Sequence, residues 1–172
     1  MIGRLFFLLP LFGMCMVYAQ RPSTPSLDSL QGMGYNTLFD KIKGAGADTA
    51  KQMVYLKAYL AKAQSEKNWG EMVQGYKNYL HRSEGGARLA YADSMVGTAK
   101  SVRDSNLIGS AYLTKGIVFY SAKQYKGALD NFLLADRFLV GTDDAYLQFK
   151  LKYNVALVKY YTEHFDEAIV LL

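Results

Sequence analysis

A frame of small and aromatic residues recurs along this chain and constrains the fold more than any other feature. The stretch 115–128 aligns with residues 155–168 at an offset of 40. Three aligned pairs define the frame, namely Gly116 with Ala156, Tyr120 with Tyr160, and Tyr125 with Phe165. A fainter copy lies upstream, where Gly75 and Tyr79 match Gly116 and Tyr120 at nearly the same offset. Self-similarity at this period indicates an array of helical repeats.

The composition supports an all-α body. The three prolines lie at positions 10, 22 and 25, so the chain from Ser26 onward contains none. Helix-favouring residues are abundant and runs of β-branched residues are few. A chain of 172 residues with 51% hydrophobic content can bury a sizeable core as one domain.

Apolar residues spaced three or four apart predict eight helical segments. They cover 36–43, 48–66, 68–82, 87–102, 105–122, 124–140, a segment that ends near 162, and one that begins near Phe165. The predicted inner faces are Met53, Leu56, Leu60 and Ala63; Leu89, Ala92, Val96 and Ala99; and Ala128, Phe132, Ala135 and Leu139.

The turns and the close approaches between helices also have sequence signals. Asp104 or Ser105 is predicted to cap segment 105–122, and Thr142 or Asp143 to cap the seventh segment. Segment 105–122 is apolar nearly all round, so it must be covered on more than one side. Small residues twelve apart are predicted to face each other across each turn, as Gly75 with Ala87, Gly116 with Ala128, and Ala156 with Ala168.

These residues resemble the tetratricopeptide repeat consensus. The match rests on Gly116, Phe119, Tyr125, Ala128, Phe132 and Ala135, and in the next unit on Ala156, Phe165 and Ala168. The consensus proline is missing, and the spacing of 37 to 41 exceeds the usual 34 or so. The resemblance implies an α-solenoid of antiparallel helix pairs over 35–172, with about four repeats and the last one truncated.

The beginning of the chain predicts export. Residues 1–19 resemble a secretory signal peptide, with Arg4 before an apolar run and with Val17 and Ala19 near a cleavage site before Gln20. The apolar run is shorter than the roughly 20 residues that span a bilayer, which disfavours a retained anchor. Residues 20–34 are predicted to be a flexible lead-in because Pro22 and Pro25 lie among serine and threonine residues.

The last predicted helix ends in four consecutive apolar residues, 169–172. Terminal repeats need a polar outer face, so we expect the chain to be a fragment of a longer protein. Several stretches, among them 55–63, 91–94 and 151–156, are similar to exported repeat proteins of Bacteroidetes-type bacteria. Some of those continue into a transmembrane helix and a helix-turn-helix or kinase module. The resemblance implies a periplasm-facing sensor or scaffold that acts in signal transduction.

The repeat register also predicts a binding groove along the first helix of each pair. The candidate residues are Trp69, Met72, Tyr76, Tyr79, Leu113, Ile117, Tyr120, Lys150, Tyr153, Leu157 and Tyr160. Tyrosine offers a large apolar face and one hydroxyl group, which suits peptide recognition. The column Tyr79, Tyr120 and Tyr160 either lines this groove or packs between repeats, and packing is the favoured interpretation.

Other functional classes lack support in the sequence. Lysine and arginine are scattered and the net charge is only +5, so nucleic acid is not a predicted partner. Cys15, the only cysteine, lies in the leader, and His81 and His164 are far apart, so neither disulfides nor a metal site is predicted. No catalytic residues or cofactors are predicted, and a membrane is expected only at the leader or beyond residue 172.

The sequence therefore predicts a non-catalytic scaffold that binds a protein or peptide, as the sensory part of a larger regulator. Two alternatives from other classes stay open. One is a structural subunit that self-associates or stabilises an envelope complex. The other is a helical domain that binds a carbohydrate or another small ligand.

Overall fold

The structure, a computed structural model, describes residues 29, 30 and 32–172, and this part of the chain contains helices and no strand. The predicted leader and residues 20–28 lie outside the described residues. In chain order the helices are α2 (Tyr35–Gly44), α3 (Thr49–Ser65), α4 (Trp69–His81), α5 (Gly86–Val102), α6 (Ser105–Ser121), α7 (Tyr125–Leu139), α8 (Ala145–Tyr161) and α9 (Phe165–Leu171). Their bounds agree closely with the predicted ones.

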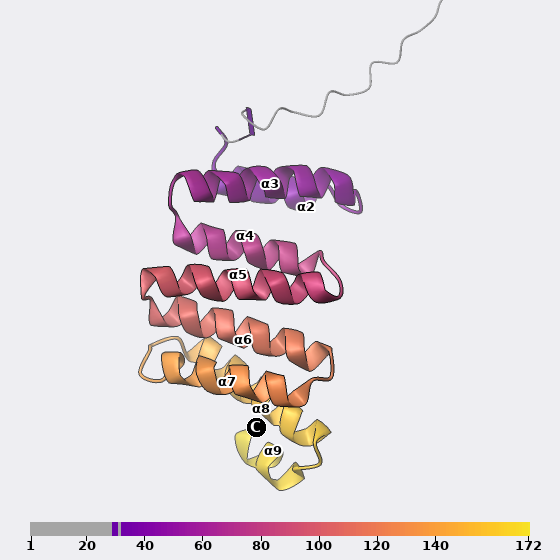
Figure 1. Cartoon of the computed structure of the whole chain (residues 1–172), viewed down its shortest axis with the longest axis vertical. Coiled ribbons are helices and arrows are strands. Elements are labelled where there is room, and N and C mark those ends of the chain that lie inside the picture. Colours follow the sequence, from indigo (N-terminus) through magenta and orange to yellow (C-terminus); the bar gives the residue numbers. More distant parts are fainter. Residues whose placement is uncertain (1–28, 31) are drawn as a thin grey trace, which may run out of the picture.

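The helices stack as consecutive antiparallel pairs along one long axis (Figure 1). The pairs are α2–α3, α4–α5, α6–α7 and α8–α9, and each helix also packs against the next one in the chain. In addition, α6 contacts α8, the first helix of the following pair. This arrangement confirms the predicted all-α, solenoid-like repeat fold.

The core forms two clusters that follow this stacking. The larger one extends from α4 to α8, and the smaller one joins Leu30 to α2 and α3. Leu30 is fully buried although it lies in the range predicted to be a flexible lead-in. The predicted inner face of α7 is confirmed in full, because Ala128, Phe132, Ala135 and Leu139 are all buried.

The other two predicted faces are partly buried. On α5 the side chains of Ala92, Val96 and Ala99 are buried, whereas Leu89 is half-buried against the core. On α3 the predicted Leu56 and Ala63 are fully buried. The rings of Tyr55 and Tyr59 are also buried there, which widens the apolar face of this helix beyond the predicted stripe.

Glycine at position 116 lets α6 and α7 approach closely. A Cβ atom at Gly116 would lie 2.4 Å from two ring carbons of Phe132 and 3.2 Å from the carbonyl oxygen of Ala128. The predicted contact between Gly116 and Ala128 is therefore present. The equivalent prediction for Gly75 is wrong, because the nearest side chain is Leu60 of α3 and Ala87 is exposed. Gly75 thus serves the contact with the preceding pair.

Side chains cap four of the helices at their N-termini. The carboxylate of Asp104 accepts a hydrogen bond of 2.9 Å from the amide of Leu107, which settles the choice between the two predicted caps of α6. For α8 the prediction is wrong by one position, because Asp144 accepts the bond from Leu147 at 2.9 Å. A capping side chain accepts from the amide three positions after it. For the amide of Leu147 that position is 144, so Thr142 and Asp143 lie too far upstream.

Two matched substitutions test the cap of α8. We expect Asp144→Ala to lower the free energy of unfolding by about 1 kcal/mol, because it leaves the amide of Leu147 without its partner. Asp143→Ala removes a carboxylate of the same charge at the adjacent position and should change it by less than about 0.5 kcal/mol. Urea denaturation followed by circular dichroism measures both. Equal effects would show that charge near the helix end, rather than the hydrogen bond, stabilises this turn.

Candidate binding surface

The predicted groove residues lie on α4, α6 and α8, the first helices of their pairs. Their environments differ because each helix has different neighbours. On α4 the side chain of Trp69 is exposed, and those of Met72 and Tyr76 are half-buried. The hydroxyl oxygen of Tyr76 accepts a hydrogen bond of 3.5 Å from the Gln64 side chain of α3. The α4 residues are thus only partly available to a partner.

The prediction for Leu113 on α6 is wrong. Its side chain is 1% exposed and belongs to the larger core cluster, which also contains Leu151 and Val158 of α8. The array continues past α6, so this position is covered rather than open. Ile117, the next predicted residue on α6, is half-buried against the same cluster.

Two tyrosines of the predicted column pack between helices. The ring of Tyr79 stacks on that of Tyr91 in α5 with centroids 5.1 Å apart, and burial raises the pKa of its hydroxyl. The ring of Tyr120 lies 6.1 Å from that of Tyr125 and 6.0 Å from that of Tyr161. Burial raises the pKa of Tyr120, and the neighbouring Tyr161 raises it further.

Tyr160, the third tyrosine of the column, is 56% exposed. It joins a chain of rings that continues from the packed pair of Tyr120 and Tyr125 through Tyr161. The ring of Tyr160 meets Tyr161 and Phe165 edge to face, at centroid distances of 5.4 and 5.5 Å. The exposed rings of Tyr160, Tyr161 and Phe165 therefore pack on one another and on the half-buried rings of Tyr120 and Tyr125.

Tyr160 is one end of an apolar stripe along the outward side of α8. Its members follow one another at intervals of three or four positions, which places them on one side of the helix. We call this set the α8 outer stripe; it comprises Tyr146, Phe149, Tyr153, Leu157 and Tyr160. Tyr146 is 69% exposed, Phe149 is 65% exposed and Tyr153 is 46% exposed. Leu157 is half-buried.

The sequence analysis found three of these five residues and missed Tyr146 and Phe149. Their spacing was a usable signal, because the aromatic residues at 146, 149, 153 and 160 share one helical face. The repeat register did not point to them, since their counterparts in the preceding repeat are Asn106 and Gly109.

Two lysines, Lys77 on α4 and Lys150 on α8, are close enough for their charges to interact. Burial lowers the pKa of Lys77 on α4, and the charge of Lys150 on α8 lowers it further. The ammonium of Lys150 lies 5.9 Å from the centre of the Tyr146 ring. Within the described part of the chain neither lysine forms an ion pair. Lys150 therefore places a positive charge beside Tyr146, at one end of the stripe.

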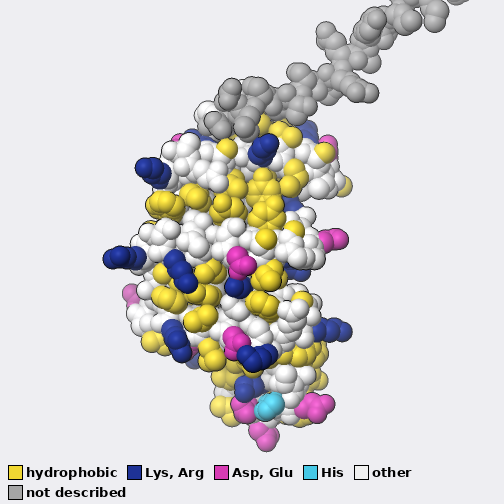
Figure 2. All heavy atoms as spheres, viewed as in Figure 1, with side chains coloured by type: hydrophobic (Ala, Val, Ile, Leu, Met, Phe, Trp, Pro, Cys, Tyr) yellow, Lys and Arg dark blue, Asp and Glu magenta, His cyan; other side chains and the backbone are white. Residues whose placement is uncertain are grey.

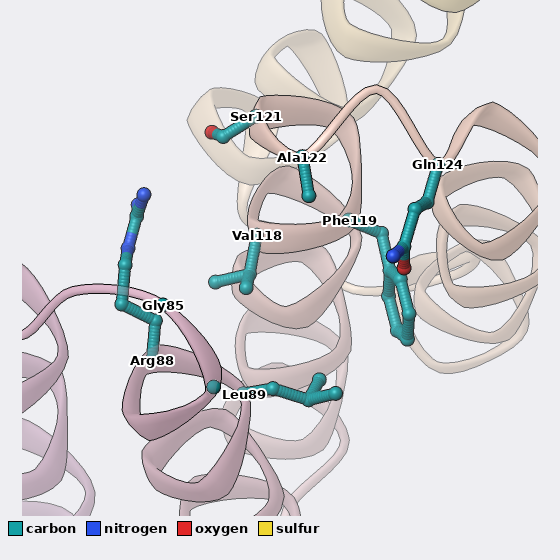
Figure 3. A pocket seen from close by; sticks show the side chains of 9 residues that line it. Gly85, Arg88, Leu89, Val118, Phe119, Ser121, Ala122 and Gln124 are labelled. Atoms are coloured by element: carbon teal, nitrogen blue, oxygen red, sulfur yellow. The ribbon is translucent and has the colours of Figure 1, made fainter.

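A separate hollow of about 370 Å³ lies between the start of α5 and the end of α6 (Figure 3). Leu89, Val118 and Phe119 supply its apolar walls, and Arg88 and Ser121 lie toward the side of the turns (Figure 3). The Ser121 hydroxyl donates a hydrogen bond to the carbonyl of Ile117 at 2.8 Å. The residues present suit an inserted apolar side chain better than a chemical step.

The described residues contain no group of three or more His, Cys, Asp or Glu side chains that could hold a metal ion. None of the described helices is both long enough and apolar enough to cross a membrane. On the face shown in Figure 2, hydrophobic side chains gather in patches and charges of both signs are scattered among them. That pattern agrees with the dispersed charge of the sequence.

Comparison with models of known families, with curated proteins and with solved structures found no match to this chain. The resemblance to tetratricopeptide repeats therefore stays a prediction that rests on the quoted residues. What the chain does has to be argued from its own surface.

Proposed function

We propose that this chain is a non-catalytic scaffold that binds a protein or peptide partner, and that the partner binds at the α8 outer stripe. One observation carries the proposal: three aromatic side chains of this stripe besides Tyr160 are about half exposed or more on one side of one helix. A contiguous exposed apolar surface of this kind marks an interaction site. Tyrosine and phenylalanine rings supply large contact areas with few rotatable bonds.

The polar interior supports a role without chemistry. Asn78, Asn131 and Asn154 are buried, and each side-chain amide donates to the backbone carbonyl four positions earlier. Every buried side-chain nitrogen and oxygen in the described part of the chain has a hydrogen-bond partner. These amides are thus paired within their own helices and leave no unsatisfied polar group in the core, which fits a scaffold.

We also propose that the chain is exported, faces the periplasm and forms the sensory part of a larger signalling or transcription-regulating protein. The leader pattern of residues 1–19 and the resemblance to exported repeat proteins support this placement. The position of Lys150 beside Tyr146 supports a partner that carries an acidic group near its apolar contact.

A capture experiment with matched variants tests the binding role. The chain from Gln20 onward is immobilised and exposed to an envelope extract of its source cells, and bound proteins are identified by mass spectrometry. We expect the Tyr153→Ala/Tyr160→Ala variant to capture at least about tenfold less of the specific partner than the original chain does. Leu133→Ala, at an exposed apolar position of α7 outside the stripe, should retain it. Circular dichroism checks that both variants fold.

A structural, self-associating subunit is the second candidate, because the same exposed stripe could pair with a copy of itself. Light scattering at increasing concentration separates the two. A monomer that captures a partner supports the first function. An oligomer that dissociates in the Tyr153→Ala/Tyr160→Ala variant supports the second. If this variant stays in the same oligomeric state and still captures the partner, the stripe serves neither function.

A further inference from the structure

The hollow between α5 and α6 lies inside the array, away from the α8 outer stripe. Helices α2 to α4 precede it in the chain and α7 to α9 follow it. The turn before α5 and the first residues of α5 form one wall, and the last turn of α6 forms the other. Its volume of about 370 Å³ is in the range of sites that hold small molecules.

The junction of α7 and α8 is the equivalent place one repeat later, and aromatic rings fill it. Tyr125 at the start of α7 stacks on Tyr161 at the end of α8, with centroids 6.2 Å apart and planes 9° apart. The ring of Tyr120 lies 6.1 Å from the first and 6.0 Å from the second. Three rings therefore pack together at this junction.

At the junction of α5 and α6 two of these three rings are missing. In the repeat register Glu84 corresponds to Tyr125, and Ser121 corresponds to Tyr161. The third position keeps a ring, that of Tyr79, but this ring stacks within its own pair of helices. The hollow therefore lies where the next junction is filled by aromatic side chains.

The walls of the hollow leave room for a ring and suit one chemically. A Cβ atom at Gly85 or Gly86 would meet nothing within 4 Å, so the start of α5 does not fill the space. Leu89 and Val118 extend into it from the two helices, and Phe119 adds a third apolar wall (Figure 3). All three belong to the larger core cluster or pack against it, so the walls are anchored. An aromatic group complements this lining.

Arg88 supplies a positive charge at the rim. Its side chain lies toward the side of the turns, whereas Leu89 and Val118 lie deeper between the helices (Figure 3). Among the described residues the Arg88 guanidinium has no ion pair or hydrogen bond. Glu84, the nearest carboxylate in the sequence, is exposed and does not line the hollow. A guanidinium pairs best with a planar carboxylate, through two parallel hydrogen bonds.

The end of α4 adds positive charge next to Arg88. Partial burial lowers the pKa of His81, and four neighbouring cations lower it further, in the order Lys77, Arg88, Arg82 and Lys150. Within the described part of the chain none of these cations is in an ion pair. The electrostatic environment of Arg88 is therefore positive, which favours an anion at this rim.

We propose that the hollow between α5 and α6 binds a small aromatic carboxylate, with its ring between Leu89 and Val118 and its carboxylate at the guanidinium of Arg88. The inference goes beyond the proposed function, because it concerns another surface and another class of ligand. The ring supplies the apolar contact that the neighbouring junction obtains from its own tyrosines. The carboxylate sets the orientation of the ligand.

Phenylacetate is the probe, because it joins one ring to one carboxylate through a short link. It is titrated into the isotope-labelled chain from Gln20 onward, which contains every described residue, and amide signals are followed by NMR spectroscopy. We expect saturable shifts at Gly85, Gly86 and Gln124, with a dissociation constant of about 1 mM or less. Acetate, which lacks the ring, and phenylacetamide, which lacks the charge, should each bind at least about tenfold more weakly. Equal binding of either compound would overturn the inference.

Two matched pairs of variants test the site from the side of the chain. Arg88→Gln should weaken binding of phenylacetate by at least about tenfold, and Arg137→Gln, at an exposed position of α7, should not. Ser121→Tyr supplies the ring of the next junction and should block the hollow, whereas Ser101→Tyr should not. The two serines are matched, because each is exposed and donates a hydrogen bond to the carbonyl four positions earlier.

Circular dichroism checks that each variant folds, and if Ser121→Tyr does not fold, the Arg88 and Arg137 pair decides alone. The absence of saturable shifts at the three amides would overturn the inference, as would binding that Arg88→Gln leaves unchanged. An N-acetylated dipeptide ending in phenylalanine that binds through Arg88 at least about tenfold more tightly than the probe would identify a peptide C-terminus as the occupant and would also overturn it.

The same probe separates this inference from the proposed function. Tyr153→Ala/Tyr160→Ala should leave binding of phenylacetate unchanged, because both residues lie on α8 and neither lines the hollow. Loss of phenylacetate binding in this variant would contradict the placement of the ligand. Capture of a protein partner that depends on the α8 outer stripe is a separate result, so either proposal can fail while the other holds.

Discussion

Gly116→Ala is expected to destabilise the chain although alanine favours a helix more than glycine does. The added methyl group would lie 2.4 Å from Cδ1 and Cε1 of Phe132, far inside normal contact distance. The backbone carbonyl of Ala128 lies 3.2 Å away on the same side, so α7 has to move. Overpacking of this kind costs about 1–3 kcal/mol, against a gain in helix propensity of about 1 kcal/mol.

Gly97 in α5 provides the matched control. It lies inside a helix of the same length, and a Cβ atom there meets nothing within 4 Å. Gly97→Ala should therefore raise the free energy of unfolding by about 0.5–1 kcal/mol. Urea denaturation measures the free energy of unfolding of both variants, and its dependence on urea concentration should be the same as in the original chain. If Gly116→Ala also stabilised the chain, the close approach of α6 and α7 would not limit this position.

The repeated frame predicts the helices well because it reports a local property, the periodicity of apolar side chains. All four residues of the predicted α7 face are buried, and Asp104 caps α6 as one of two predicted candidates. The cap of α8 was misplaced by one position because three consecutive residues, Thr142, Asp143 and Asp144, could each act as a cap. Local propensity alone does not choose among them.

The candidate site was harder to predict because exposure depends on neighbours along the array. Leu113 and Tyr153 occupy the same register position, yet one is buried and the other is open. Gly75 matches Gly116 in sequence, but it contacts α3 instead of the second helix of its own pair. A repeat register specifies which face of a helix is apolar, and it does not specify which helices cover that face.

This distinction also explains why the aromatic residues of one register column have different roles. Tyr79 and Tyr120 contact rings of a neighbouring helix, so replacing them tests stability before it tests binding. Tyr160, the third member of the column, is exposed, and so is Tyr153, one helical face away from the core cluster on the same helix. Variants of this column that are aimed at partner binding should therefore be confined to α8, where the apolar surface has no cover among the described residues.

Phe132→Ala is expected to have the largest effect on stability in the chain. Phe132 is 1% exposed, is the largest fully buried side chain among the described residues and lies against Gly116 of the facing helix. Its removal leaves a cavity between α6 and α7 and should lower the free energy of unfolding by about 3–5 kcal/mol. The adjacent Leu133 is exposed to solvent, so Leu133→Ala should change it by less than about 0.5 kcal/mol. A similar loss for both would contradict the assignment of Phe132 to the core.

The double variant Gly116→Ala/Phe132→Ala tests the contact between positions 116 and 132 directly. Without the ring, the methyl group at position 116 loses its two closest contacts and keeps the carbonyl of Ala128 at 3.2 Å, so most of its penalty should disappear while its helix propensity remains. We expect the double variant to be more stable than Phe132→Ala alone, with a coupling energy of about 1–3 kcal/mol in the cycle. Additive effects would mean that Gly116 and Phe132 act independently, and the repeated glycine would then need another explanation.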